Sequence, residues 1–194
     1  MSIIDQKLVD YTKLIKSHLD SLTNLEDFYD TIFNSAFDNR PILVFGNGGS
    51  AAIADHLACD WTKGVNGASP TYFPRVLSLC SNQALLTAIA NDYGYEYTFS
   101  KQIAYAPYQH AIAIAISSSG NSENIIQGLK AAASKNYTCM ALVGFDGGRV
   151  VSDALALNKT LHVKSYNYGI VEDSHSIIMH VIAQRLAEEM SIVK

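Results

Sequence analysis

The chain has 194 residues, of which 48% are hydrophobic and 16% charged, and its formal net charge is −4. This length and composition predict one globular domain with a core of its own. The negative charge and the lack of any basic block argue against nucleic acid as a partner. No uncharged apolar run reaches the roughly 18 residues that span a membrane. The three cysteines, Cys59, Cys80 and Cys139, form no CxxC pair, and the charged N-terminal sequence is unlike a signal peptide. We therefore expect a soluble cytoplasmic protein with free thiols.

The N-terminal part of the chain has the pattern of two helices. Within residues 3–36 the apolar side chains recur at intervals of three to four, and a polar turn at Thr23 and Asn24 divides the pattern. Such spacing is typical of amphipathic helices. It predicts an N-terminal helical hairpin over residues 1–38.

From Pro41 onward, short apolar runs alternate with amphipathic segments. Continuous apolar strands separated by helices indicate a parallel sheet that is covered on both faces. The predicted strands are PILVFG, RVLSLC, AIAIAIS, TCMALVGF and TLHVKSY, and the predicted helices are 50–63, 82–91, 121–135, 147–154 and 172–190. We expect a doubly wound α/β fold with a five-stranded parallel sheet in residues 39–194, and a single domain over residues 1–194.

Ligands of such sheets bind outside the carboxyl ends of the strands, so the residues that follow each strand are candidates for a site. The segment SSSGNS at 117–122 places four serines between a strand and a helix, and it contains neither Lys nor Arg. Hydroxyl and backbone N–H groups at a helix N-terminus can bind phosphate. A serine-rich turn with an N-cap has the same composition, and the residues alone leave both interpretations open.

The segment FGNGGS at 45–50 is a second loop of this kind. Gly46, Gly48 and Gly49 allow a sharp turn and a close approach to a ligand, and Ser50 can cap the next helix or offer its hydroxyl. The segment lacks the third glycine of a dinucleotide fingerprint. Two such loops at neighbouring strand ends favour one shared cleft.

Ionisable residues stand on the helices that follow. His56 and Asp60 are four residues apart on one helix face, where they form a metal-binding pair, an acid–base pair or an ordinary surface pair. Glu172 and His180 stand on the last predicted helix, where a dipole-stabilising acid and a buried histidine are ordinary alternatives. Eight helical residues give a rise of about 12 Å. One ion therefore reaches both only if Glu172 precedes the helix, or if the two residues belong to different copies in an oligomer.

Several separated segments together resemble one family. GNGGS, the HxxxD helix, ANDYG at 90–94, ISSSGNS, the GFDGG turn and the late helix with His180 resemble the sugar isomerase (SIS) domain. More narrowly, they resemble the phosphoheptose isomerases, which convert sedoheptulose 7-phosphate to a heptose 7-phosphate. The resemblance covers nearly the whole chain. It implies a homotetramer with active sites at subunit interfaces, and zinc as the cofactor found in some members.

The resemblance also implies roles for individual residues. The implied phosphate ligands are Ser50, Ser117, Ser119 and Ser122, and the implied contacts of the open-chain sugar are Asn47, Asp92 and Ser118. Gly48 and Gly49 belong to the same substrate-binding loop. Asp60 takes the position of the catalytic carboxylate and His180 that of the catalytic histidine. The implied metal ligands are His56, Asp60, Glu172 and His180.

Some positions depart from the family pattern. Asp60 is one methylene shorter than the usual glutamate, Glu172 replaces a glutamine that binds both metal and sugar, and Gly169 stands where the family has a sugar-binding aspartate. DWTKG at 60–64 also differs from the usual EL-TGR sequence. These departures predict that the chain belongs to a branch close to the best-known phosphoheptose isomerases, and that it acts on the same heptose or on a related phosphosugar. We hypothesise that Glu172 takes over a ligand or base role that the shorter Asp60 performs less well.

The predicted function is an aldose–ketose isomerase of heptose biosynthesis, which converts sedoheptulose 7-phosphate to D-glycero-D-manno-heptose 7-phosphate through an enediolate. A carboxylate and a histidine on opposite sides of C1 and C2 provide the acid–base chemistry, a zinc ion would polarise the carbonyl, and the phosphate would supply remote binding energy. The alternative is a non-enzymatic SIS-domain module that binds a phosphosugar or a protein partner, such as one that assists replication-initiator assembly. The joint presence of His56, Asp60 and His180 favours the enzyme.

Overall fold

A parallel sheet forms the centre of the molecule in a computed structural model that describes residues 2–153, 155 and 157–193. Its strands are β1 (Pro41–Gly46), β2 (Arg75–Ser78), β3 (Ile112–Ser117), β4 (Thr138–Val143) and β5 (Leu157–His162). They lie in the order β2-β1-β3-β4-β5, and all neighbours are parallel. The predicted five-stranded doubly wound sheet is confirmed. Its order reverses between β1 and β3, where doubly wound sheets bind their ligands.

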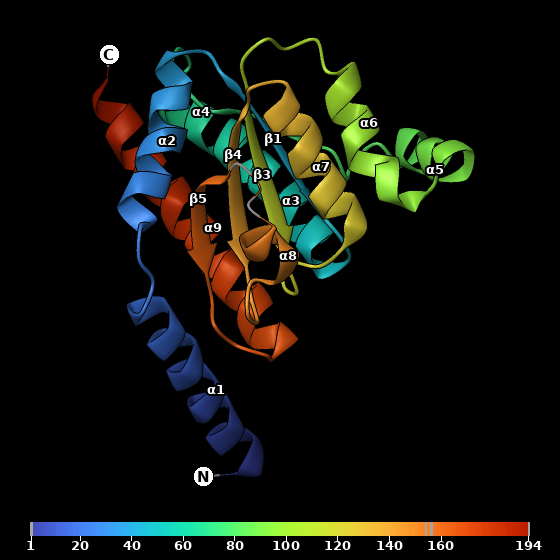
Figure 1. Ribbon diagram of the computed structural model, residues 1–194. Helices are drawn as coiled ribbons and strands as arrows, with labels where there is room; N and C mark the ends of the chain where they lie inside the picture. Colours follow the sequence, from blue (N-terminus) through green and yellow to red (C-terminus); the bar gives the residue numbers. More distant parts are fainter. Residues whose placement is uncertain (1, 154, 156, 194) are drawn as a thin grey trace.

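Helices cover both faces of the sheet (Figure 1). Alternate side chains of β1 divide between two cores, because successive residues of a strand point to opposite faces. Ile42 and Val44 belong to one core, and Leu43 and Phe45 to the other. The helices of the first face are α2 (Leu25–Phe37), α3 (Gly49–Cys59), α4 (Val65–Ala68) and α9 (Tyr168–Ile192). Those of the second face are α6 (Thr98–Tyr105), α7 (Glu123–Ser134) and α8 (Gly148–Ser152), and α5 (Gln83–Tyr93) lies further out.

Both helices of the predicted N-terminal hairpin are present, but they do not pack side by side. Figure 1 shows that α1 (Ile3–Asp20) projects away from the sheet beyond the end of α2. It contacts α9 instead, and the Tyr11 hydroxyl donates a hydrogen bond to Asp173 (2.8 Å). The hairpin geometry was wrong because apolar spacing determines where helices form, whereas the angle between them depends on the surface that each helix meets. Several apolar side chains of α1 remain exposed, namely Ile3, Ile4, Leu8, Val9 and Leu14.

Some element boundaries differ from the predictions. β5 was predicted at 160–166 but ends at His162. The last helix was predicted from residue 172, yet it begins at Tyr168, because the side chain of Asn167 caps it by accepting the N–H of Ile170 (3.2 Å). The helix at 98–105 was not predicted.

The remaining predictions can be placed as follows. The helix predicted at 147–154 is α8, and residue 154 lies outside the described residues, as do the chain ends of the predicted 1–194 domain. Cys59, Cys80 and Cys139 are free thiols, as expected. Among the described helices, none combines the length and the hydropathy that a membrane span requires.

Candidate functional site

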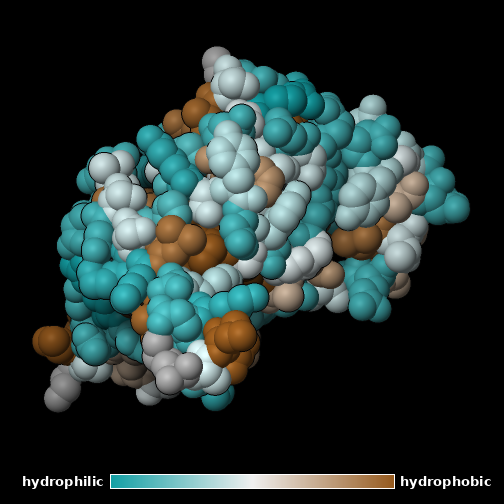
Figure 2. Space-filling model, turned by 90° about the horizontal axis from the view of Figure 1, so that it is seen from below, coloured by the Kyte–Doolittle hydropathy of each residue, from teal (hydrophilic) through white to brown (hydrophobic). Residues whose placement is uncertain are grey.

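A cavity of about 280 Å³ lies beyond the carboxyl ends of β1 and β3. Its lining residues are Asn47, Gly48, Gly49, Ser50, Ser117, Ser118, Ser119, Ser122, Tyr168 and Glu172. The two strands run in register up to the pair Gly46 and Ile116, so the loops that follow them start at the same level. The structure thus brings together the two loops that the sequence singled out. Figure 2 shows the molecule from this end of the sheet, where hydrophilic side chains cover most of the surface.

The serine loop, residues 117–122, offers hydrogen-bonding groups without any cation. The hydroxyl of Ser117 accepts the N–H of Gly120 (3.0 Å), and the hydroxyl of Ser119 accepts the N–H of Asn121 (3.3 Å). Within the described part of the chain, the buried hydroxyl of Ser118 has no partner, and Ser122 caps α7 without a side-chain hydrogen bond. These two hydroxyls therefore remain for a ligand, and the first N–H groups of α7 remain for an anion.

The GFDGG turn, residues 144–148, packs against the serine loop at Gly120. Gly120 has φ +65°, and a Cβ added to it would lie 2.1 Å from the carbonyl oxygen of Gly147. The N–H of Val150 donates to the carbonyl of Gly120 (2.9 Å). Only glycine fits this approach at a positive φ. The GFDGG turn, which helped to indicate the family, thus acts by holding the serine loop in place.

Asn47 connects the glycine loop to the first turn of α7. It forms a reciprocal amide pair with Asn124, with two hydrogen bonds of 2.8 Å. The Tyr95 hydroxyl donates to the side-chain oxygen of Asn47 (2.9 Å). Neither Asn124 nor Tyr95 was predicted. A polar asparagine among the apolar residues of the helix ENIIQGL was the signal that could have identified Asn124.

Glu172 lies against the glycine loop rather than beside the histidines. A Cβ added to Gly49 would lie 2.6 Å from both of its carboxylate oxygens, so the absent side chain of Gly49 makes room for this carboxylate. The position at the N-terminus of α3 favours a negative charge because of the helix dipole. Among the described residues, Glu172 is thus the one acid that lines the cavity.

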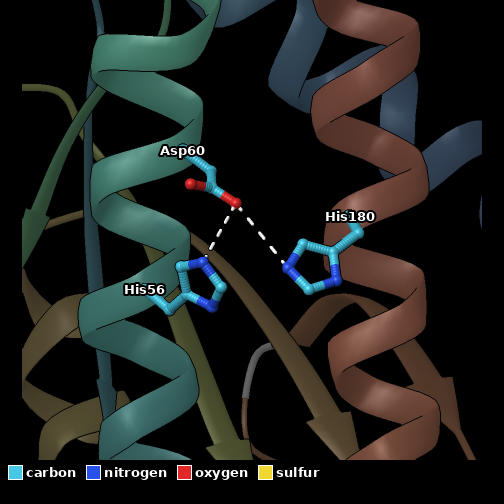
Figure 3. Close-up of side chains that lie close together, drawn as sticks. All are labelled: His56, Asp60 and His180. Atoms are coloured by element: carbon cyan, nitrogen blue, oxygen red, sulfur yellow. Dashed lines mark ion pairs between the residues drawn. The ribbon is translucent and has the colours of Figure 1, made fainter.

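A second cluster of side chains lies where α3 and the helical turn that continues it, Asp60–Gly64, face α9. It consists of His56, Asp60 and His180, which we call the Asp60 group, and Figure 3 shows how these side chains converge. Oδ2 of Asp60 lies 3.4 Å from Nε2 of His56 and 3.7 Å from Nε2 of His180. The two imidazole rings meet edge to face with centroids 5.0 Å apart. The His180 side chain is 46% exposed, so it is not the buried core histidine that the sequence left as an alternative.

The donor atoms of His56, Asp60 and His180 all lie within 4.8 Å of one another. Two imidazoles and one carboxylate are ligands that zinc accepts in catalytic sites, where an open position remains for substrate. The adjoining cavity of about 20 Å³ has room for one water-sized group. The donor set therefore fits a zinc ion chemically.

A local change of helix type positions Asp60. The helix that begins as α3 continues as a π-helix, Asp60–Gly64, where an α-helix was predicted through residue 63. Trp61 is buried, and its indole N–H donates to the carbonyl of Met179 (3.1 Å). Met179 directly precedes His180, so this hydrogen bond joins the two elements where the acid and the histidine meet. The π-helix is rare and appears mostly as single turns inside α-helices, frequently at functional sites.

Two predicted site residues lie elsewhere. Glu172 is not part of the described His56, Asp60 and His180 group. Because α9 is continuous from Tyr168 to Ile192, Glu172 does not precede the helix, and within one chain a single ion cannot reach both Glu172 and His180. The prediction of Glu172 as a ligand of the same ion is thus wrong for an isolated chain.

Asp92 is also apart from the cavity. It is exposed on α5 and accepts a hydrogen bond from Asn91 (2.9 Å). Figure 1 shows α5 at the outer edge of the molecule. The sugar contact that the resemblance implied for Asp92 does not form within one chain.

Comparisons with known proteins agree with this fold. The model of the SIS domain family matches residues 10–144, and the chain belongs to this family. Its relatives are phosphoheptose isomerases. It is 32% identical to the phosphoheptose isomerase of Campylobacter concisus over 187 residues, 96% of either chain. It is 38% identical to that of Aquifex aeolicus over 153 residues, 79% of this chain and 77% of the relative. The structure of phosphoheptose isomerase GmhA from Neisseria gonorrhoeae matches with a TM-score of 0.83 at 26% identity, covering 95% of this chain and 97% of that one.

Proposed function

We propose that the chain is an aldose–ketose isomerase that converts sedoheptulose 7-phosphate to D-glycero-D-manno-heptose 7-phosphate. The observation that carries the proposal is the position of Asp60 between the imidazoles of His56 and His180. The same two elements, α3 with its continuation and α9, also contribute residues to the cavity beyond β1 and β3, which we call the anion cavity. The names of the relatives at 32% and 38% identity support the same reaction.

The cavity would bind the substrate through its phosphate. The serines that we assign to the phosphate are Ser50, Ser117, Ser119 and Ser122, all of which line the cavity. Asn47 and Ser118 would contact the open-chain sugar. The binding energy of the phosphate then holds C1 and C2 in place while they react.

Asp60 and His180 would carry the proton transfers. Asp60 removes a proton from C1, next to the carbonyl at C2, and the enediolate forms. Asp60 then returns the proton to C2, while His180 moves a proton between the oxygens on C1 and C2. General acid–base catalysis by positioned groups contributes roughly 10²–10⁴-fold each. His56, Asp60 and His180 would hold a zinc ion, which when bound polarises the carbonyl as a Lewis acid.

We further propose that the active form is a homotetramer with sites at subunit interfaces. Within one chain the anion cavity and the Asp60 group have different lining residues, and Asp92 lies away from both. A neighbouring copy would complete the site, and the exposed apolar side chains of α1 provide surface for such contacts. We place the enzyme in the cytoplasm, because a reducing compartment preserves its three free thiols.

The test is proton NMR of the purified protein with sedoheptulose 7-phosphate in D₂O, with and without a chelator. We expect a new aldose anomeric signal, and its loss on chelation would support the metal site. Folded, metal-replete protein that forms no aldose and incorporates no deuterium would contradict the isomerase and favour a phosphosugar-binding module.

A further inference from the structure

Tyr168 is the aromatic side chain among the described residues that line the anion cavity. It stands one turn before Glu172 at the start of α9. We propose that Tyr168 determines substrate specificity by contacting the sugar part of the phosphosugar, on the Glu172 side of the cavity. The proposal rests on the proposed function, which leaves this residue without a role.

The ring of Tyr168 is supported although the residue is 59% exposed. The ring of Phe145 meets it edge to face, with centroids 4.8 Å apart and an interplanar angle of 73°. Phe145 also stacks on Tyr166, at 5.4 Å and 24°. Offset-stacked and edge-to-face contacts are the arrangements that aromatic rings prefer. A half-exposed tyrosine is therefore held in one place at the mouth of the cavity.

The backbone of Phe145 makes this support possible. Its φ is +48°, a region that a bulky residue rarely adopts. The N–H of Phe145 donates to the carbonyl of Ser165 (3.0 Å), and its own carbonyl lies 3.0 Å from Nε2 of His162. Strained conformations of this kind persist where the surroundings hold them, and they cluster at functional sites.

Gly169, the next residue, has no side chain that could contact the sugar in place of Tyr168. A Cβ added to Gly169 would lie 2.6 Å from the hydroxyl oxygen of Tyr11. That hydroxyl donates to Asp173 (2.8 Å), so Tyr11 cannot move away without losing a hydrogen bond. A side chain at position 169 would therefore have to displace the Tyr11 hydroxyl, whereas Tyr168 already lines this side of the cavity.

The charges assign the two sides of the cavity to different parts of the ligand. The carboxylate of Glu172 repels a phosphate group at short range, whereas the serine loop offers neutral donors at the start of α7. The phosphate thus belongs on the serine side and the polyol chain on the side of Glu172 and Tyr168. A phenol suits a polyol, because its ring packs on C–H groups and its hydroxyl both donates and accepts hydrogen bonds.

The test compares two probes on the full chain, sedoheptulose 7-phosphate and inorganic phosphate, by calorimetric titration. Tyr168→Phe removes one neutral hydrogen bond, so we expect affinity for the sugar phosphate to fall about 3- to 10-fold. Tyr168→Ala also removes the ring and should weaken it further. Affinity for inorganic phosphate should not change. In turnover assays KM should rise while kcat stays constant, as for an interaction made equally in the ground and transition states.

Tyr166→Phe is the matched control, because it keeps the stacking ring and removes a hydroxyl that does not line the cavity. It should leave both affinities unchanged. Equal losses for both probes in the Tyr168 variants would overturn the proposal, since Tyr168 would then only shape the cavity. Unchanged affinity for the sugar phosphate would overturn it as well. Failure of the isomerase reaction is distinguishable, because the titrations detect binding of the sugar phosphate whether or not the chain converts it.

Discussion

The anion cavity and the Asp60 group differ in how the fold holds them. The cavity is built largely from backbone, with close contacts at Gly49 and Gly120, and at Gly120 only glycine fits. The Asp60 group consists of side chains that extend from two helices, and they are 34% to 60% exposed. A rigid cavity is formed before the ligand arrives, whereas exposed side chains adjust when a metal or a neighbouring subunit arrives. Substitutions in the two regions should therefore have separable effects.

The largest effect is expected from Asp60→Asn. It removes the base but leaves the cavity intact, so kcat should fall by roughly 10²–10⁴-fold while affinity for inorganic phosphate is retained. Asp55→Asn is the matched control, because Asp55 is an exposed acid on the same helix. NMR-detected turnover together with phosphate titration checks this. If phosphate binding fell in parallel with turnover, the two regions would not be separable.

Low pH should destabilise the whole fold, and with it both regions, through protonation of His175. This residue lies on α9 between Glu172 and His180. Burial lowers the pKa of His175 to about 4, and among the described residues Nε2 of its ring donates only to the carbonyl of Val143 (3.3 Å). In the unfolded chain the His175 imidazole has its ordinary pKa of 6.5. Between pH 6.5 and pH 4 the unfolded chain therefore binds more protons than the folded chain. The free energy of unfolding should then fall with decreasing pH, by on the order of 3 kcal/mol in total.

Urea unfolding at several pH values measures this dependence. His175→Gln removes the titrating group, so its stability should vary less between pH 6.5 and pH 4 than that of the unchanged chain. His110→Gln, at an exposed position, should keep the full dependence. Identical pH profiles for His175→Gln and the unchanged chain would show that other groups cause the loss.

Gly120→Ala should damage the cavity without touching Asp60. A Cβ there would lie 2.1 Å from the carbonyl of Gly147 at φ +65°, and overpacking of this kind costs about 1–3 kcal/mol. We expect a lower free energy of unfolding and weaker binding of inorganic phosphate. In Gly67→Ala, no described atom lies within 4 Å of the new Cβ, and this helical position should tolerate alanine. Unfolding curves and phosphate titrations of both variants would sharpen the contrast.

The smallest effect is expected from Glu172→Gln. Removing the one acid that lines the cavity should strengthen phosphate binding by about 3-fold, because a like charge is removed at a solvated site. Turnover should fall if Glu172 takes part in binding the sugar or the metal, as we hypothesise. Undiminished turnover and metal content would rule out that role and leave Glu172 as a partner of the helix dipole.

Most of the cavity could be predicted from the sequence, because its parts are local. GNGGS and SSSGNS each follow an apolar strand, and parallel strands bring the residues after them to the same edge of the sheet. The interpretation of SSSGNS as a mere capped turn does not account for Ser118 and Ser122, whose hydroxyls have no partner among the described residues. Asn124 and Tyr95 were missed because their contacts with Asn47 join segments far apart in the chain.

The Asp60 group was predicted only in part. The four-residue spacing of His56 and Asp60 is visible in the sequence, but the π-helix at Asp60–Gly64 and the hydrogen bond from Trp61 to Met179 are not. Those two features bring His180 to Asp60. Glu172 was assigned to the same ion by resemblance, whereas the continuous α9 holds it apart from His180 within one chain.

The sequence by itself determined the strands, the glycine and serine loops and the family, because these depend on apolar periodicity and on residues that act close to their own position. Only the tertiary structure decided the direction of α1, the meeting of Asp60 with His180, the place of Glu172 beside Gly49 and the support of Tyr168 by Phe145. Each of these depends on how a helix or a loop packs on a distant part of the chain. Packing of that kind is set by shape and hydrogen bonding between surfaces, which local sequence patterns do not encode.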